Sequence, residues 1–287
     1  MSNIKGYDTM MRFTNQSQVD NILIDTWHGT DSPFFMGRYL TNADRPGDNV
    51  PNPADKKMTL NEVKLLSANN INIVSIYQEI KFKVSKFDYD RGMSDVERAV
   101  SAAESLHQPS GTPIYFAAEV SLDSLDSGGI NTLHQYLQGI KDALSSSIMN
   151  PNGYTFGVYG PQDTCRKIKN EWYSSVLTFY GKPYGTYYNG WTVKQDNSPS
   201  GYTGGLINVV DFDTARNSDY GGWQYHQYPF HWSNYGNMAM HRKKCLYCNR
   251  YIYEVHTPNS AGNRCTVCGY EGPMITPMSD QGGEQDE

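Results

Sequence analysis

The stretch INIVSIYQ, residues 71–78, is a run of apolar and β-branched side chains that ends in a glutamine. Such a run is typical of a strand that is buried on both faces of a parallel sheet. One capping box, Thr59-x-x-Glu62, predicts a helix start before it, and another, Ser94-x-x-Glu97, predicts one after it. The stretch therefore lies in an alternation of strand and helix, which indicates the α/β class.

This alternation extends along the chain up to about residue 213. The expected strands are 5–10, 34–40, 71–78, 113–120, 154–160, 174–181, 190–195 and 206–213. Eight strand–helix units in this length predict a closed (β/α)8 TIM-type barrel, with parallel strands. The units from about residue 174 leave little room for helices, so we expect a degenerate barrel there. An open doubly wound sheet is the alternative, but no glycine-rich phosphate loop follows the first strand.

Composition limits the classes of partner. The chain has 287 residues, of which 19% are charged, and its net charge is −6, so we do not expect nucleic acid as the partner. No apolar run is long enough to span a membrane. The start, MSNIKGYDTMMRF, lacks the basic and apolar regions of a signal peptide. We expect a cytoplasmic protein, or a secreted or phage-encoded one that reaches the cell wall by lysis or a specialised route.

The sequence divides into four segments. Residues 1–225 are expected to form the barrel, and 226–240 are a linker or a segment that packs on it. Residues 241–273 form a small module, and 274–287 are a flexible acidic tail.

The small module contains four of the five cysteines, in two C-x-x-C pairs that are 16 residues apart: Cys245, Cys248, Cys265 and Cys268. Two such knuckles converge into a tetrahedral site of four thiolates, which predicts a zinc ribbon with a structural Zn²⁺ ion. Iron in a rubredoxin-like site and a pair of disulfides are the alternatives. Because four sulfurs fill the site, we expect His241 and His256 at the surface. The fifth cysteine, Cys165, is expected to be a buried apolar residue.

Basic residues gather where the ribbon begins: His241, Arg242, Lys243, Lys244 and Arg250. Ribbons often bind nucleic acid, and a basic patch can also meet an anionic polymer such as a teichoic acid. A solvated charged face is the third interpretation, and the sequence leaves all three open.

Carboxylates follow several of the expected barrel strands. Acids stand at or near the ends of five strands, namely Asp8, Glu79, Glu119, Asp196, Asp211 and Asp213, and the ends of barrel strands form one mouth. Two carboxylates in different environments are what glycoside hydrolysis requires. We therefore expect catalytic acids among them, although a structural role remains the alternative for each. Polar and aromatic residues nearby are expected to hold sugar hydroxyls: Arg38, Gln78, Tyr115, Tyr159 and Gln195.

The order of motifs KGYDTM, FFMGRYL, IVSIYQ, PIYFAAEV, YTFGVYG, WTVKQ and INVVDFD resembles a family of bacterial and phage glycoside-hydrolase-like barrels, over about residues 1–225. That family is similar to the family-25 (Chalaropsis-type) muramidases, which cleave the glycan of peptidoglycan. By this resemblance, Asp8 and Asp211 match the acids that end the first and last strands. Glu119 matches the strand-four position where the muramidases carry a D-x-E pair, and Ala117 stands where the first acid of that pair would be.

The resemblance implies a peptidoglycan-directed glycoside hydrolase of the lysozyme or endolysin type. Glu119 would be the general acid, with a pKa raised by the apolar strand behind it, and Asp8 and Asp211 would stabilise the transition state or position water. The ribbon would attach the protein to the cell wall. A non-catalytic carbohydrate-binding barrel is the alternative, which Ala117 favours, and an adaptor for nucleic acid or a partner protein is a third. The oligomeric state stays open.

Overall fold

A computed structural model describes residues 3–24, 34–41, 56–79, 84–181, 188–196, 210–227, 233–234, 240–246, 250–258, 260, 264–268 and 270. The chain divides into two compact units, Met1–Tyr225 and His226–Glu287. Among the residues described, no helix combines the length and the apolar character that a membrane crossing needs.

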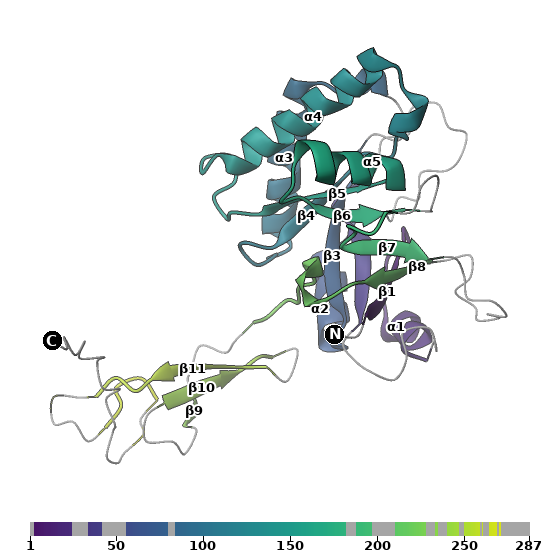
Figure 1. Ribbon diagram of the computed structural model, residues 1–287. Helices are drawn as coiled ribbons and strands as arrows, with labels where there is room; N and C mark the ends of the chain where they lie inside the picture. The colour runs from purple at the N-terminus through teal and green to yellow at the C-terminus, as the bar shows by residue number, and fades with distance from the viewer. Residues whose placement is uncertain are drawn as a thin grey trace, which may run out of the picture. The chain divides into compact units, whose positions relative to one another are not determined.

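The first unit is a closed barrel of eight strands in chain order, as predicted (Figure 1). Its strands are β1 (Ile4–Asp8), β2 (Phe35–Tyr39), β3 (Asn72–Tyr77), β4 (Pro113–Ala117), β5 (Thr155–Gly160), β6 (Leu177–Tyr180), β7 (Val193–Asp196) and β8 (Asp211–Ala215). The helices between them are α1 (Gln16–Leu23), α2 (Leu60–Ala68), α3 (Tyr89–Ser105), α4 (Ser127–Ser145) and α5 (Gln162–Lys167). A short helix, η4 (Ser218–Tyr220), follows the last strand.

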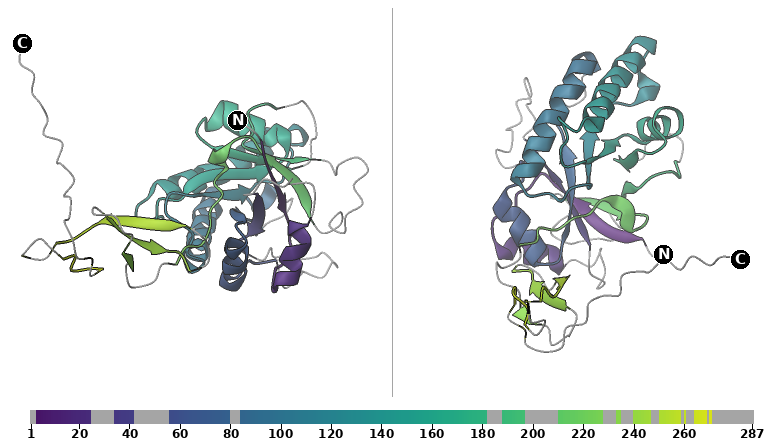
Figure 2. Two further views of the ribbon diagram at one scale, coloured as in Figure 1. Left: turned by 90° about the horizontal axis from the view of Figure 1, so that it is seen from below. Right: turned by 90° about the vertical axis from the view of Figure 1, so that its left-hand side faces the viewer.

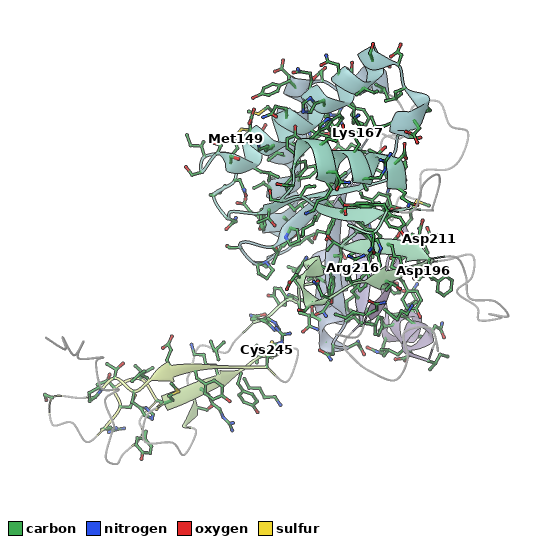
Figure 3. The ribbon with its side chains drawn as sticks, viewed as in Figure 1. Met149, Lys167, Asp196, Asp211, Arg216 and Cys245 are labelled. Carbon is green, nitrogen blue, oxygen red and sulfur yellow. The ribbon has the colours of Figure 1, made fainter. Side chains whose placement is uncertain are left out.

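The last strand corrects the expectation of an all-parallel barrel. Neighbouring strands from β1 to β7 pair in parallel, but β8 is antiparallel to both β7 and β1. Figure 3 shows the result, with Asp211 and Asp196 at one end of the β7–β8 pair and Arg216 toward the other. Among the described residues, no helix separates β6 from β7 or β7 from β8. Because β8 is antiparallel to β7, the connection between these two strands needs no helical crossover, which is one departure from eight strand–helix units.

The helix starts depend on side-chain caps. At α2 the predicted capping box is confirmed, because Thr59 Oγ1 accepts from the Glu62 N–H while the Glu62 carboxylate accepts from the Thr59 N–H. The predicted start of the next helix at Ser94 is wrong. The Asp88 carboxylate accepts from the Arg91 N–H, so α3 begins at Tyr89. Helices α3 and α4 lie side by side on the outside of the barrel (Figure 2).

The end of the barrel where the parallel strands begin is closed by aromatic rings. Helix η4 places the Tyr220 ring against the Phe35 ring, with 4.9 Å between centroids. The Tyr220 hydroxyl accepts from Asn72 Nδ2, and its carbonyl accepts from the Tyr115 hydroxyl at 2.8 Å. The opposite end, where the parallel strands stop, carries several acids and amides, and we call this end the mouth.

A buried ion pair joins β2 to α2. Arg38 is 0% exposed, and its Nε donates to Glu62 Oε1 at 2.6 Å. The guanidinium also donates to the carbonyls of Thr9 and Lys56. Glu62 in turn accepts from the Phe13 N–H while it caps α2. One pair of charges therefore fixes the segment after β1, the segment before α2 and the start of the helix.

Arg38→Met should destabilise the protein by about 3–5 kcal/mol, because it leaves the Glu62 carboxylate buried without its counter-charge. Urea unfolding followed by circular dichroism measures the loss. The double variant Arg38→Met/Glu62→Leu should lose less than the sum of the two single variants. A single-variant loss below about 1 kcal/mol, the range of a surface pair, would contradict this account.

Candidate functional site

Asp8 is the last residue of β1, which ends at the mouth. Side chains alternate in direction along the strand, and that of Asp8 points into the barrel. Its neighbour Tyr7 faces outward, where its ring contacts those of Phe34 and Phe212. Asp8 pairs in register with Gly37 of β2, and a Cβ on that glycine would lie 2.7 Å from the Asp8 Cβ. The glycine therefore provides the space for the carboxylate, which is 2% exposed as a residue.

The reversed strand β8 adds two more acids to the same face. Asp211 stands opposite Asp8, and Asp213, two residues on, stands opposite Gln195. Burial raises the pKa of Asp8 well above its usual value, and the charges of Asp211 and Glu119 raise it further. The cations Lys56 and Arg38 offset part of this shift. A directly opposed pair of like charges is unfavourable, so at least one acid here favours its protonated form.

Asp213 lies deeper than the other acids. It is 0% exposed, and neither carboxylate oxygen has a hydrogen-bond partner in the described part of the chain. Burial raises its pKa well above the usual value, and the charges of Asp8 and Asp211 add to the shift. The surroundings of Asp213 therefore favour the protonated form of its carboxyl group.

Glu119 projects from a tight turn just after β4. The strand ends at Ala117, and the Val120 N–H donates to the Ala118 carbonyl at 2.8 Å, which closes a three-residue turn around Glu119. The turn packs closely on β5, since a Cβ on Gly160 would lie 2.6 Å from the Ala118 oxygen. Glu119 follows β4 and is partly exposed, so solvent can reach its carboxylate.

A chain of hydrogen bonds crosses the mouth. Lys56 Nζ donates to Gln78 Oε1, and Gln78 Nε2 donates to Glu119 Oε2. The lysine is 3% exposed, and its Nζ lies 3.7 Å from the Tyr39 ring centroid. On the other side, Gln195 Nε2 donates to Asp8 Oδ2 at 3.4 Å. Two amides thus orient two of the carboxylates.

Lys56 is the site residue that the sequence analysis missed. It lies between β2 and α2 in an irregular segment, where a single lysine carries no strand or helix signal. Its position comes from an isolated bridge between Tyr39 and Lys57 and from the Met58 N–H, which donates to the Tyr39 carbonyl at 2.8 Å. In the sequence, Lys56 is marked only by its position three residues before Thr59, the threonine of the capping box.

Two tyrosines complete the lining. Tyr39 and Tyr159 are both nearly buried, and both belong to the cluster that fills the barrel interior. Burial raises the pKa of each hydroxyl well above its usual value, and the Asp8 charge is the next cause for both. The two phenols therefore stay protonated and lie within electrostatic reach of the acids.

Two of the expected sugar-binding residues are placed elsewhere, which corrects those expectations. Arg38 points out of the barrel, because the inward positions of β2 are Phe35, Gly37 and Tyr39, and its donors bind Glu62 and backbone carbonyls. Tyr115 points inward but lies at the closed end, where its hydroxyl donates to the Tyr220 carbonyl.

The structure brings the other expected residues together at the mouth: Asp8, Gln78, Glu119, Tyr159, Gln195 and Asp211. On β4, the position two residues before Glu119 is Ala117, which is 3% exposed and packs in the apolar cluster. The carboxylates that accompany Glu119 at this mouth are therefore supplied by β1 and β8 rather than by β4.

The second unit contains a three-stranded antiparallel sheet, in the order β11 (Tyr251–Val255), β10 (Met240–Lys244) and β9 (Ser233–Asn234). Both cysteine knuckles begin with the same backbone bond. The Cys245 N–H donates to the Arg250 carbonyl, and the Cys265 N–H donates to the Tyr270 carbonyl, each at 2.8 Å. The donor and the acceptor are thus five residues apart in both C-x-x-C pairs.

A candidate metal centre lies in the second knuckle. Within the part of the chain that the structure describes, ligand atoms of His256, Cys265 and Cys268 lie within 4.8 Å of one another. Cys245 is buried but is not in this group, and Cys248 lies outside the described residues. The group can hold a metal ion.

His256 corrects the expectation of a surface residue. It is 6% exposed, and its ring stacks on Tyr270 with 4.8 Å between centroids. Its Nδ1 lies 3.5 Å from Cys268 Sγ. Burial acts to raise the pKa of the Cys265 thiol, but backbone N–H groups of Cys268 and Val267 outweigh it and lower the pKa to about 5. A thiolate that accepts backbone N–H groups is suited to bind a metal.

Comparison with known proteins identifies related chains. The model of the Rv2525c-like, glycoside hydrolase-like domain family matches residues 25–244. The uncharacterized protein YbfG of Bacillus subtilis (strain 168) is 34% identical over 132 residues, which are 45% of this chain and 17% of YbfG. The matched stretch is thus a small part of that relative.

Two solved structures share the fold. The Tat-secreted Mycobacterium tuberculosis protein Rv2525c, solved in complex with HEPES, is 20% identical with a TM-score of 0.55, over 77% of this chain and 98% of that one. An uncharacterized B. stearothermophilus protein is 16% identical with a TM-score of 0.51, over 77% of this chain and all of that one.

Asp213→Asn should stabilise the protein, and the gain should grow with pH. The raised pKa means that the folded state retains a proton which the unfolded chain loses above about pH 4, so wild-type stability falls as pH rises toward the folded-state pKa. Each unit of that difference is worth about 1.4 kcal/mol. Urea unfolding at pH 4, 6 and 8 measures it, with the exposed Asp90→Asn as control. A variant less stable than wild type at pH 8 would refute this.

Proposed function

The chain belongs to the Rv2525c-like, glycoside hydrolase-like domain family, and from this premise we propose that its barrel hydrolyses the glycan strands of peptidoglycan. The observation that carries the proposal is the convergence of three acids from β1, β4 and β8 at one mouth, in different environments. Asp8 is nearly fully buried, Glu119 is partly exposed and Asp211 is exposed.

Glu119 is the proposed general acid. It is held at the mouth by its tight turn and by the donor Gln78 Nε2, and it is open enough to approach a glycosidic oxygen. Asp211, exposed at the start of β8, is the proposed second carboxylate, which stabilises positive charge at the anomeric carbon or activates water. A protonated Asp8 between them donates a hydrogen bond instead of adding a third negative charge.

The remaining groups of the mouth suit a polyhydroxyl ligand. Gln78 and Gln195 offer amide donors and acceptors, and Tyr159 offers a phenol that stays protonated. Lys56 is proposed as a positioning residue, because it donates to the amide that holds Glu119.

A non-catalytic carbohydrate-binding barrel is the second candidate. The apolar environment of Ala117 favours it, because β4 lacks a second acid beside Glu119. Both candidates place the protein at the cell wall. The Tat-secreted Mycobacterium tuberculosis neighbour supports a site of action outside the cytoplasm.

We also propose that the second unit holds a structural Zn²⁺ ion. Cys265 and Cys268 are ligands in this proposal, with the first knuckle, Cys245 and Cys248, completing the site. The shared backbone bond and the low pKa of the Cys265 thiol support it. The group of His256, Cys265 and Cys268 supports a metal ion at the second pair. Thiolates in tetrahedral sites favour zinc, and a small sheet with so little core gains much of its folding energy from the metal.

Glu119→Gln should reduce the release of reducing ends from purified Gram-positive peptidoglycan by about 10²-fold or more, the usual contribution of a general acid. The matched control is Glu79→Gln, which follows β3 but pairs with Arg91 and Arg98. It should keep wild-type activity. Wild-type protein that binds the glycan and leaves it intact would establish the binding barrel instead. Hydrolysis that survives Glu119→Gln would reject Glu119 as the acid.

The full chain should contain one zinc ion, measured by inductively coupled plasma mass spectrometry. Cys265→Ser and Cys268→Ser should lose it, and amide NMR signals of residues 240–270 should collapse while barrel signals persist. The control Cys165→Ser changes a thiol that is buried in the barrel, so the zinc content should not change. Iron in place of zinc, or full retention of metal by Cys265→Ser, would contradict the assignment.

A further inference from the structure

One face of the β10–β11 hairpin carries two cations and two tyrosines. Register pairs Arg242 with Tyr253 and Lys244 with Tyr251, and directly opposed residues share a face of the sheet. Lys243 pairs with Ile252 on the other face. We call the set Arg242, Lys244, Tyr251 and Tyr253 the cation–tyrosine face.

The cations of this face are held over a ring. The Arg242 guanidinium lies 4.5 Å from the Tyr251 ring centroid, and Lys244 Nζ lies 6.0 Å from it. The Tyr251 and Tyr253 rings are 6.3 Å apart. A guanidinium stacked in this way is held in place, so little rotamer freedom remains to be lost when it binds a planar or tetrahedral anion.

Apolar and aromatic side chains of this face are exposed. Tyr253 is 45% exposed, and Met240 and Val255, a register pair on the same face, are 37% and 40% exposed. Exposed aromatic and apolar side chains next to fixed cations mark a surface that contacts a partner.

Local charge indicates the sign of that partner. Between residues 226 and 270 the chain has five Lys and Arg residues and one acid, Glu254, whereas the whole chain carries −6. Glu254 pairs with His241 on the face that carries Lys243, so the cation–tyrosine face has no acid among its described residues. The partner it complements is therefore anionic.

We propose that the cation–tyrosine face binds an anionic wall polymer, in which phosphodiester groups link sugar or polyol units. Arg242 and Lys244 bind its phosphates, and Tyr253 contacts its carbon backbone. Single-stranded nucleic acid fits less well, because it stacks successive bases on several rings, and with cations over Tyr251 the face offers mainly the Tyr253 ring. This binding is independent of hydrolysis by the barrel.

The test measures binding of the full zinc-loaded chain to poly(glycerol phosphate) and, as a rival, to an oligothymidylate with the same number of phosphates. The variants are Arg242→Gln/Lys244→Gln and Tyr253→Ser. Lys243→Gln is the matched control, since it removes an adjacent charge from the opposite face. Cell walls stripped of phosphodiester polymers by hydrofluoric acid are compared with untreated walls. Zinc content and amide NMR verify that each variant is folded.

The double variant should weaken binding to poly(glycerol phosphate) by about tenfold or more, Tyr253→Ser severalfold, and Lys243→Gln by less than about threefold. Binding to untreated walls should exceed binding to stripped walls, and the double variant should abolish that excess. These binding measurements do not depend on wall lysis. Failure of the glycosidase proposal can therefore be distinguished from failure of the binding proposal.

Four outcomes would overturn the proposal. An equal loss of binding in Lys243→Gln would show a general electrostatic attraction that is not specific to the cation–tyrosine face. Tighter binding of the oligothymidylate would identify nucleic acid as the partner. A wild-type dimer that the double variant dissociates would place a second copy on the face. Absence of binding to the phosphate polymer would reject the site outright.

Discussion

The buried pair of Arg38 and Glu62 is the constraint on which the mouth of the barrel depends. Charges so far from water are unfavourable unless they are closely paired, and here the pairing involves three separate segments. The guanidinium binds carbonyls of Thr9, next to the first acid, and of Lys56, the cation of the mouth. Its charge also lowers the pKa of Asp8 against the stronger effect of burial. One side chain thus supports both the geometry and the electrostatics of the acids without facing them.

At the mouth, acids repel one another while hydrogen bonds hold two of the carboxylates in place. Asp8, Asp211 and Asp213 follow one face of two adjacent strands, and folding places them together despite their repulsion. Amides from β7 and the end of β3 partly compensate, since each binds a carboxylate. Such an arrangement lowers stability locally and is retained where proton affinity matters, which is the physical reason to regard this end of the barrel as functional.

Much of this architecture could be predicted from particular residues. The β-branched run at 71–78 and the Thr59–Glu62 box fix a strand and a helix through local propensity. Asp8 and Glu119 could be found because acids at the ends of parallel barrel strands meet at one mouth. Asp211 was expected there at the end of a parallel strand, but it reaches the mouth because β8 is reversed and begins with it. The direction of β8 could not be predicted, since strand composition does not encode it. Arg38 was placed wrongly because the sequence of β2 does not show which alternate side chains face into the barrel. Lys56 and His256 could not be predicted because their positions depend on tertiary contacts of irregular segments.

The reversal of β8 also decides how the barrel can be elaborated. The strand starts at the mouth and ends beside the beginning of β1, so the chain leaves the barrel at its closed end, past Tyr220 and the bridge between Trp223 and Ile73. The covalent junction with whatever follows Tyr225 is therefore remote from the acids. Appended modules can be exchanged or lost at this junction during evolution, or fused there by design, without remodelling the residues that give the mouth its chemistry.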